Sequence, residues 1–430
     1  MVHSAPVSRF RTSVVFVALL TLVGCPAPPP IPDIPTDLPT ETPTPGATPT
    51  PTPIDPRDAL RVPADPAAML DDGDLPSLRA SVDQSLSWLA AQPPGRKLTF
   101  GPRTVTVKEL AAGLTGFRKM LADNPSPEVL AERVREAFDA VEAVGAAFYG
   151  RVLFTGYYEP TIEASLTKKP GYEVPVYTRP KDFIEIPISE WGGQYEGQRK
   201  LIGRLEGSRV RPYWTREEIG FGTLEGKKLE IAWAKDAVDL FFVEIQGSGT
   251  LILPDGKKKR IGYNGSNSRP YRSIGALLIE EGEIPSATMS MQSLRTWLAE
   301  HPEEKARVLE HNESYVFFRF LETGPVGSLN RPVTPRRSIA TDLSLFPPGA
   351  LAFVSTDHPV ATMNTAGQPV ITWAPLDRFV LNQDTGGAIK GAGRADFFWG
   401  QGPEATLAAG MMKQPGKLYF LVPKTPAPVP

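Results

Sequence analysis

Between residues 71 and 145 the apolar positions recur with the spacing of an α-helix. Residues three and four positions apart share one face of a helix, so each regular series predicts one amphipathic helix. Thr106 with Glu109 has the spacing of a capping box, and Ser126 followed by Pro127 is typical of a helix start. We therefore expect three helices, whose apolar stripes are Leu78, Val82, Leu86 and Leu89, then Leu110, Leu114, Phe117 and Leu121, then Leu130, Val134, Phe138 and Val141.

After residue 146 the pattern changes to short runs of β-branched and aromatic residues, separated by glycine, proline, asparagine and aspartate. Many short strands without helices between them favour barrels or sandwiches over a parallel βαβ sheet. Hairpin turns are expected at Asp255-Gly256 and at Thr365 to Gly367. The predicted strands lie in LFFVEIQGSGTLILPDGKKKRIGYNG, YVFFRF, ALAFVST, TMNTAGQPVITWAPL and KLYFLVP.

The N-terminal stretch has the features of a secretory signal. Arg9 and Arg11 precede an apolar run of about ten residues, which is too short to span a bilayer. The run ends in LVGC, which resembles a bacterial lipobox, so we expect Cys25 to be lipidated and to become the mature N-terminus. The alternative is a plain signal peptide with an incidental cysteine. Cys25 is the only cysteine, so no intramolecular disulfide can form.

Residues 26–57 are rich in proline and threonine and carry few apolar side chains. Such a segment favours polyproline II at about 3.1 Å per residue, and would reach roughly 100 Å when extended. We interpret it as a spacer between a membrane anchor and a folded domain, with tolerated low complexity as the alternative. No aspartate follows Cys25, which by bacterial sorting rules favours the outer membrane.

Composition narrows the classes of function. The chain has 430 residues, 41% of them hydrophobic, as expected for a soluble globular protein of two or three domains. Its formal net charge of −2 gives no support for a nucleic-acid partner. There is no nucleophile elbow, Walker loop or dinucleotide fingerprint, and the four histidines are not at metal-ligand spacing, so we expect neither a metal nor another cofactor.

Carboxylates remain as candidate catalytic groups, and they are the usual acids for cleaving a glycosidic bond. Asp342, Asp384 and Asp396 each lie where a strand-like run meets a turn, a position that can present a carboxyl group at a barrel rim. His358 remains an alternative base, although a surface histidine in a loop is the favoured interpretation.

Five motifs in this order resemble the membrane-bound lytic murein transglycosylase A family, and the likeness covers residues 148–423. The three aspartates also match the C-terminal domain named for them. The motifs are FTGYYEP from Phe154, VEIQGSG from Val243, GYNGSNSRPYRSIG from Gly262, NESYVFFR from Asn312 and DTGGAIKGAGRADFFWG from Asp384.

The resemblance implies a mainly β fold with an N-terminal helical segment. A double-psi β-barrel would carry an inserted second β-barrel domain, with the substrate groove between them. The expected parts are a lipoprotein signal peptide over 1–24, an anchor and linker over 25–57, helices and the first part of the barrel over 58–160, the insert over 161–328, the second part of the barrel over 329–424, and a tail over 425–430.

The resemblance also implies the reaction. The β-1,4 bond between N-acetylmuramic acid and N-acetylglucosamine in peptidoglycan would be cleaved without water, leaving 1,6-anhydromuramoyl ends. The family's catalytic acid falls on Asp396, which would act first as acid and then as base, and Asp384 would support it. Substrate contacts are expected from Thr155, Tyr157, Tyr158, Glu159, Gln246, Gly247, Ser248, Gly387 and Lys390.

The enzyme would be lipid-anchored in the outer membrane, face the periplasm and act on glycan strands, with cell-wall synthesis or division proteins as candidate partners.

Two alternative functions stay open at this point. One is a hydrolase on the same fold that uses a second carboxylate, such as Asp384, and a water molecule. The other is a wall-binding lipoprotein without activity. Asp342 is expected to be structural, and the glycines Gly386, Gly387, Gly391 and Gly393 to permit a tight turn or the close approach of a sugar.

Overall fold

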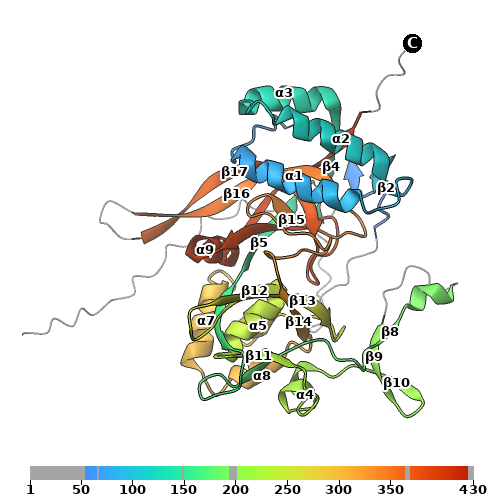
Figure 1. The fold of residues 1–430 in the computed structure, drawn as a ribbon. Coiled ribbons are helices and arrows are strands. Elements are labelled where there is room, and N and C mark those ends of the chain that lie inside the picture. The colour runs from blue at the N-terminus through green and yellow to red at the C-terminus, as the bar shows by residue number, and fades with distance from the viewer. Residues whose placement is uncertain (1–53, 65–66, 147–149, 193–200, 364–368, 425–430) are drawn as a thin grey trace, which may run out of the picture. The chain divides into compact units, whose positions relative to one another are not determined.

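The computed structural model describes residues 54–64, 67–146, 150–192, 201–363 and 369–424 (Figure 1). The predicted signal peptide, Cys25 and nearly all of the linker lie outside the described residues. So does the turn predicted at Thr365 to Gly367, although the two strands that flank it are described and paired. In the described part of the chain no helix has both the length and the apolar character needed to cross a membrane.

The three predicted N-terminal helices are confirmed as α1 (Leu75–Leu89), α2 (Val107–Met120) and α3 (Pro127–Ala137). Thr106 and Glu109 form the reciprocal capping box at α2, and the Ser126 side chain caps α3. The third stripe was predicted too long. Phe138 is extended, and β4 (Phe138–Ala143) begins there, because this segment pairs with β19 (Lys413–Pro423) and buries its apolar side chains in that ladder.

Six strands close into the expected barrel, each hydrogen-bonded to the next in the order β19, β16, β17, β15, β18, β5 and back to β19. The pairs β15–β17 and β18–β5 are parallel and the others are antiparallel. Beyond β19 the sheet continues through β4 to β1 (Leu60–Arg61). The barrel strands are β5 (Val152–Glu159), β15 (Ser338–Ala340), β16 (Leu351–Met363), β17 (Pro369–Asp384), β18 (Arg394–Gln401) and β19.

Helices α1 and α2 pack on the barrel and share its core (Figure 1). Helix α1 contacts β17 and α2 contacts β19. The aromatic rings of Phe117 and Phe379 meet edge to face at 5.5 Å between centroids, and Phe353 meets Phe379 at 5.0 Å. Edge-to-face aromatic pairs of this kind stabilise a core beyond the area they bury. The hairpin β2 (Lys97–Phe100) and β3 (Arg103–Thr106) leads into α2.

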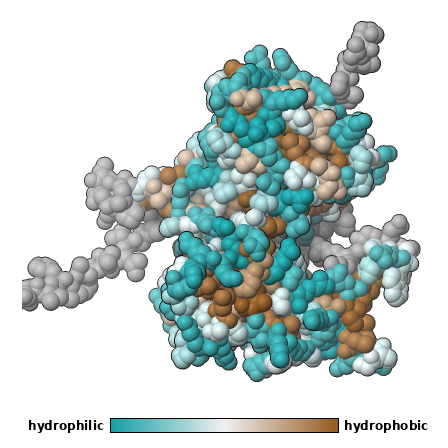
Figure 2. Space-filling model, in the orientation of Figure 1, coloured by the Kyte–Doolittle hydropathy of each residue, from teal (hydrophilic) through white to brown (hydrophobic). Residues whose placement is uncertain are grey.

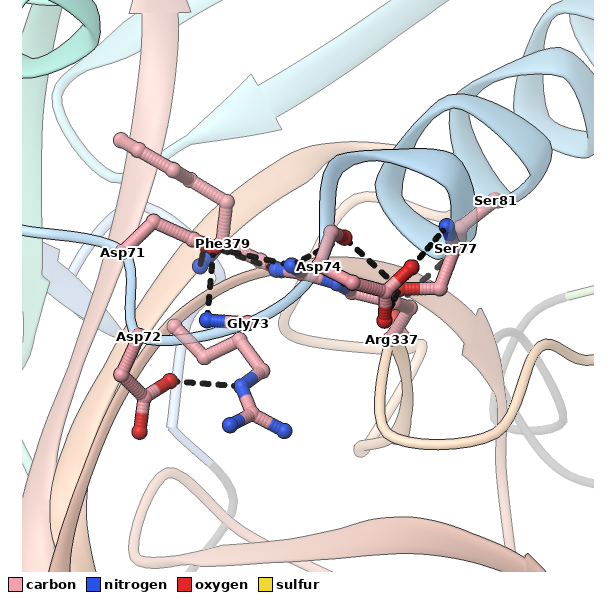
Figure 3. A network of polar contacts seen from close by, with 9 residues as sticks. Asp71, Asp72, Gly73, Asp74, Ser77, Ser81, Arg337 and Phe379 are labelled. Carbon is pink, nitrogen blue, oxygen red and sulfur yellow. Dashed lines mark hydrogen bonds and ion pairs between the residues drawn. The ribbon is translucent and has the colours of Figure 1, made fainter. Parts of the chain in front are cut away.

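A fully buried arginine ties the segment before α1 to the barrel (Figure 3). The Arg337 guanidinium donates two hydrogen bonds to the Asp71 carboxylate, at 2.7 and 2.8 Å. Its other donors reach Ser77 Oγ and the carbonyl oxygens of Asp74 and Phe379. Every donor group of this side chain therefore has an acceptor, as a buried charge requires.

The segment between β5 and β15 forms a second sheet, in the order β14-β13-β12-β6-β11-β7. Its two edge strands, β7 and β14, also contact one another, so the sheet is rolled. The turn at Asp255-Gly256 joins β12 to β13 as predicted, with Gly256 at a φ of 78°. The strands are β6 (Thr161–Ser165), β7 (Val174–Tyr177), β11 (Glu230–Ala234), β12 (Ser248–Ile252), β13 (Lys258–Ser266) and β14 (Val316–Leu321).

A smaller sheet joins β8 (Ile184–Ile186), β9 (Leu201–Glu206) and β10 (Arg209–Pro212). Figure 2 shows apolar surface over β9 and β10 at the lower right, where Leu201, Leu205 and Val210 are exposed.

The insert contains helices where only strands were expected. Helix α5 (Ala237–Gln246) occupies the LFFVEIQ stretch, so the strand predicted there is wrong. The periodicity of a short, largely buried apolar run does not distinguish a helix from a strand. The residues at the two ends of the run determine its secondary structure. Asp236 caps the helix start, and Gly247, at a φ of 76°, ends it. The other helices of the insert are α4 (Arg216–Gly220), α6 (Ile274–Glu280), α7 (Met291–Glu300), α8 (Lys305–Glu310) and a 3-10 turn at Ile188–Trp191. Helix α9 (Pro403–Met411) belongs to the barrel part, between β18 and β19.

Candidate active site

Asp396 lies inside the closed barrel sheet and not at a strand end. It is the third residue of β18, and it pairs with Thr155 of β5 on one side and Ala340 of β15 on the other. The Thr155 hydroxyl donates a hydrogen bond to Asp396 Oδ1. Two residues far apart in sequence thus meet because β5 and β18 run parallel as neighbours.

The surroundings of Asp396 favour its neutral form. Burial raises the pKa of this carboxyl from 3.8 to about 6; the negative charge of Asp384 also raises it, and the positive charge of Arg394 lowers it. A carboxylic acid that holds its proton close to neutral pH is suited to donate that proton to a leaving group.

Asp384 ends β17 and lies on the other side of β15, where it also pairs with Ala340. The two aspartates therefore flank one residue of β15, with their Cα atoms about 10 Å apart as expected for strands one place removed. Asp384 Oδ1 accepts the backbone N–H groups of Ser328 and Thr385, both at 2.8 Å. Burial raises the pKa of this carboxyl, and these hydrogen bonds oppose the rise.

Tyr157 lies two residues after Thr155 on β5 and therefore points to the same side of the sheet. Its ring packs on Phe398, with 4.9 Å between centroids. Burial raises its pKa well above 10, and the carboxylates of Asp384 and Asp396 raise it further. Within the described chain the buried hydroxyl has no hydrogen bond of ordinary geometry. The tyrosine is thus a neutral hydroxyl placed near both carboxyl groups.

Asp342 holds the loop that joins the two other aspartates. Its carboxylate accepts the Gly391 N–H at 2.9 Å and the Ser344 hydroxyl at 2.6 Å. These hydrogen bonds and the charge of Lys390 outweigh its burial and lower its pKa. This arrangement supports the expected structural role. Among the four loop glycines only Gly391 has a positive φ, of 80°, so the expectation of a special backbone conformation holds there and not at Gly386, Gly387 or Gly393.

The other predicted contact residues fall into two groups. Tyr158 and Glu159 are buried: Tyr158 belongs to the barrel core, and Glu159 accepts hydrogen bonds from Thr250 and Gln401. Gln246 accepts the Tyr158 N–H at 3.0 Å, next to the turn made by Gly247 and Ser248. By contrast, Gly387 is exposed and Lys390 partly exposed on the loop before Asp396. Substrate contact by these residues stays a prediction.

Two residues at the site were missed from the sequence. Ser328 was not singled out because its backbone N–H binds Asp384, a contact that no motif marks. Arg394 could have been found, since residues two apart in a strand share one face and Arg394 precedes Asp396 by two. Arg394 also lines a cavity of about 1170 Å³ together with the segment around Arg57 and Arg61.

His358 stands apart from this site. It lies on β16, where its ring is 5.4 Å from that of Trp399 and burial lowers its pKa. In the part of the chain that the structure describes, no cluster of three or more histidine, cysteine, aspartate or glutamate side chains is arranged to hold a metal ion.

Comparison with known proteins agrees with the motifs. Residues 153–319 match the MltA specific insert domain and residues 337–422 match the 3D domain. Membrane-bound lytic murein transglycosylase A of Escherichia coli K12 is 34% identical over 286 residues, which are 66% of this chain and 69% of that protein. Its counterpart in Vibrio cholerae is 33% identical over 287 residues, 66% of this chain and 68% of that protein.

Solved structures extend the likeness to the fold. A membrane-bound lytic murein transglycosylase from Agrobacterium tumefaciens superposes with a TM-score of 0.69 at 32% identity, covering 85% of this chain and 97% of that chain. Escherichia coli MltA with bound chitohexaose gives a TM-score of 0.62 at 26% identity, covering 85% and 94%. On the sequence identity and its coverage, this chain belongs to the membrane-bound lytic murein transglycosylase A family.

Proposed function

We propose that this chain is a peptidoglycan lytic transglycosylase that cleaves the β-1,4 bond between N-acetylmuramic acid and N-acetylglucosamine and leaves a 1,6-anhydromuramoyl end. The names of its relatives support the general activity, because those proteins are lytic murein transglycosylases. The bound chitohexaose of the Escherichia coli relative supports a glycan strand as the ligand. The observation that carries the mechanism is the position of Asp396 on β18, hydrogen-bonded to Thr155 of β5 in surroundings that raise its pKa to about 6.

In this proposal Asp396 cycles one proton. Its neutral carboxyl protonates the glycosidic oxygen, the bond from that oxygen to muramoyl C1 breaks, and an oxocarbenium-like centre forms at C1. The resulting carboxylate takes the proton of the C6 hydroxyl as O6 attacks C1. No water is consumed, and Asp396 ends neutral again. Because the attacking hydroxyl belongs to the same sugar, proximity replaces a bimolecular encounter.

Asp384 serves as the supporting residue. Its Oδ1 accepts two backbone N–H groups, so the carboxyl is fixed in place, and its negative charge adds to the burial that raises the pKa of Asp396. A water-activating base is not needed when the substrate carries its own nucleophile. Tyr157 contributes a neutral hydroxyl near both carboxyl groups, suited to hold a sugar oxygen.

The glycan strand would run past the face of β5 and β18 that carries Thr155 and Asp396, in a groove between the barrel and the insert. The loop with Gly387 and Lys390 would border that groove. The turn at Gln246, Gly247 and Ser248 would contact it from the insert side. Tyr158 and Glu159 would act indirectly, since Glu159 links the barrel residue Gln401 to Thr250 of the insert.

Membrane association follows from the relatives, which are named membrane-bound. We propose that lipid on Cys25 provides it, that the anchor lies in the outer membrane with the enzyme facing the periplasm, and that the proline-rich segment lets the enzyme reach the wall. Cell-wall synthesis or division proteins remain proposed partners.

Mass spectrometry of the products tests the proposal. Murein digested with the protein should release muropeptides that are lighter by one water than the hydrolysed products and lack a reducing muramic acid end. Asp396→Asn should abolish their release, because the amide has no acidic proton to give. The exposed Asp357→Asn on β16 is the matched control and should behave like the native chain. Reducing ends would mean a hydrolase, and an Asp396→Asn variant with full activity would remove Asp396 from the mechanism.

A further inference from the structure

Two arginines of the barrel differ in how many of their N–H groups have a hydrogen-bond acceptor. Arg337 is fully buried, and each of its nitrogens donates to an acceptor of the protein (Figure 3). Arg394 is partly buried, and its Nε–H is shielded from solvent without an acceptor among the described residues. Leaving a buried donor unsatisfied costs free energy, so a side chain kept only for stability is expected to resemble Arg337.

Among the described residues, a hydrogen bond from Arg394 leads toward Asp396, the proposed acid. Its Nη2 donates to Thr155 Oγ1 at 3.3 Å, and the Thr155 hydroxyl donates to Asp396 Oδ1. The strand register imposes this alignment, because Arg394 pairs with Leu153 and Asp396 with Thr155 along the parallel ladder of β18 and β5. The three side chains therefore form a chain of donors that ends on one oxygen of the carboxyl group.

The direction of these hydrogen bonds is fixed by chemistry. A guanidinium only donates, so Thr155 Oγ1 must accept from Arg394 and keeps its single hydrogen for Asp396. Oδ1 is then an acceptor, and the proton of the neutral acid is held on Oδ2. We propose that Arg394 is a positioning residue for the cleavage reaction: through Thr155 it orients the Asp396 carboxyl and confines the transferable proton to Oδ2.

This inference rests on the proposed function and adds to it a reason why Asp396 presents its proton to the substrate. The charged or titratable groups that act on Asp396 are Arg394 on its own strand and Asp384 on β17, and the Tyr157 hydroxyl on β5 lies near both carboxyls. The Tyr271 hydroxyl of the insert lies close enough to Arg394 to interact with its charge.

The test compares pH–rate profiles of the mature chain on isolated glycan strands. Activity requires neutral Asp396, so it falls on the alkaline side as this carboxyl ionises. Arg394→Met removes the positive charge, and Thr155→Val removes a donor to the carboxylate. Both changes disfavour ionisation, so each should move the alkaline limb to higher pH, by about one unit for Arg394→Met. Each should lower kcat by about tenfold with little change in KM, since a misplaced catalytic group costs rate more than binding.

The double variant distinguishes a relay from two separate effects. If Arg394 acts through Thr155, then Arg394→Met should lower kcat much less in the Thr155→Val background than in the native chain. Thr155→Ser and Arg394→Lys keep the hydroxyl and the charge and should recover part of the rate. Arg336→Met removes another guanidinium of the barrel, one that pairs with exposed Glu404, and should leave the profile unchanged.

The possible outcomes distinguish a failure of the Arg394 inference from a failure of the proposed function. An unmoved alkaline limb in folded Arg394→Met, or additive losses of kcat in the double variant, would overturn the inference while Asp396→Asn remained inactive. Active Asp396→Asn would overturn the proposed function instead. If Arg394→Met does not fold, Thr155→Val provides the test, because valine is nearly isosteric with threonine. An unchanged alkaline limb of the pH–rate profile in Thr155→Val would also overturn the inference.

Discussion

Replacing the acid by its amide should make the protein more stable at neutral pH while abolishing activity. In the native chain Asp396 is held where its charged form is disfavoured, so folding at neutral pH is opposed by the work of ionising it there. The pKa of about 6 in the folded state, against 3.8 in an unfolded chain, corresponds to roughly 3 kcal/mol at about 1.4 kcal/mol for each pKa unit. Asp396→Asn is similar in shape, carries no charge and removes this cost.

The sign of the pH dependence follows from proton binding. Between pH 3.8 and about 6 the folded state holds more protons on this group than the unfolded chain, so the free energy of unfolding decreases as pH rises. The gain from Asp396→Asn should therefore be at most about 3 kcal/mol at pH 7.5 and shrink to about 1 kcal/mol at pH 4.5. Urea unfolding followed by tryptophan fluorescence measures it, and Trp399 on the same strand is a buried reporter.

Asp342→Asn is the matched control with the opposite sign. The pKa of Asp342 is lowered in the folded state, so its charge stabilises the fold at neutral pH and this contribution is lost as pH falls through the folded pKa. The amide at position 342 should thus reduce stability at pH 7.5 and matter less in acid. The reasoning fails if Asp396→Asn is less stable than the native chain at pH 7.5, or if its gain does not shrink between pH 7.5 and pH 4.5.

Two further predictions concern the acid and the buried ion pair. At substrate concentrations well below KM, the rate of anhydromuropeptide release should fall to half its maximum near pH 6 on the alkaline side. Above that pH it should fall about tenfold for each pH unit, because an acid with this pKa loses its proton there. A rate that still rises between pH 6 and pH 8 would contradict this prediction. Arg337→Met should lower the free energy of unfolding by about 3–5 kcal/mol in urea, because it leaves the buried Asp71 carboxylate without its cation, and adding Asp71→Asn should recover part of the loss. A loss below about 1 kcal/mol would mean that Asp71 finds another partner.

The N-terminal helices could be predicted because their signals are local. The capping residues Thr106 and Ser126 and the 3.6-residue stripes need no knowledge of the rest of the chain. The predictions of secondary structure were wrong where residues distant in the sequence determine the conformation. Phe138 continues a helical stripe, yet it is extended because β19, almost three hundred positions later, offers a ladder. Helix α5 lacks a period that distinguishes it from a strand, since the five consecutive residues 240–244 are all buried.

The candidate site likewise contains features that the sequence indicated and features that depend on the three-dimensional fold. Motif order pointed to Asp396 and Asp384 as the acid and its supporting residue, and their roles stay predictions. The structural role expected for Asp342 agrees with its hydrogen bonds to Gly391 and Ser344. Spacing could not tell that Thr155 lies beside Asp396, because this depends on the register of two parallel strands. Nor could it tell which motif residues are buried: Glu159 looks like a substrate ligand in FTGYYEP but is 1% exposed. Contacts that arise from pairing across the insert cannot be read from either segment alone.

The closure of the barrel also bears on when the enzyme can become active. Strand β5 precedes the insert, whereas its two partners β18 and β19 lie near the end of the chain. Thr155 and Asp396 are 241 positions apart, so their hydrogen bond cannot form until almost the entire polypeptide has emerged. Contacts of such long range form slowly, because a large loop must first be closed. Under the proposed mechanism, a chain that is incomplete or truncated at its C-terminus would lack the Thr155–Asp396 pair and could not cleave glycan strands until its synthesis is complete.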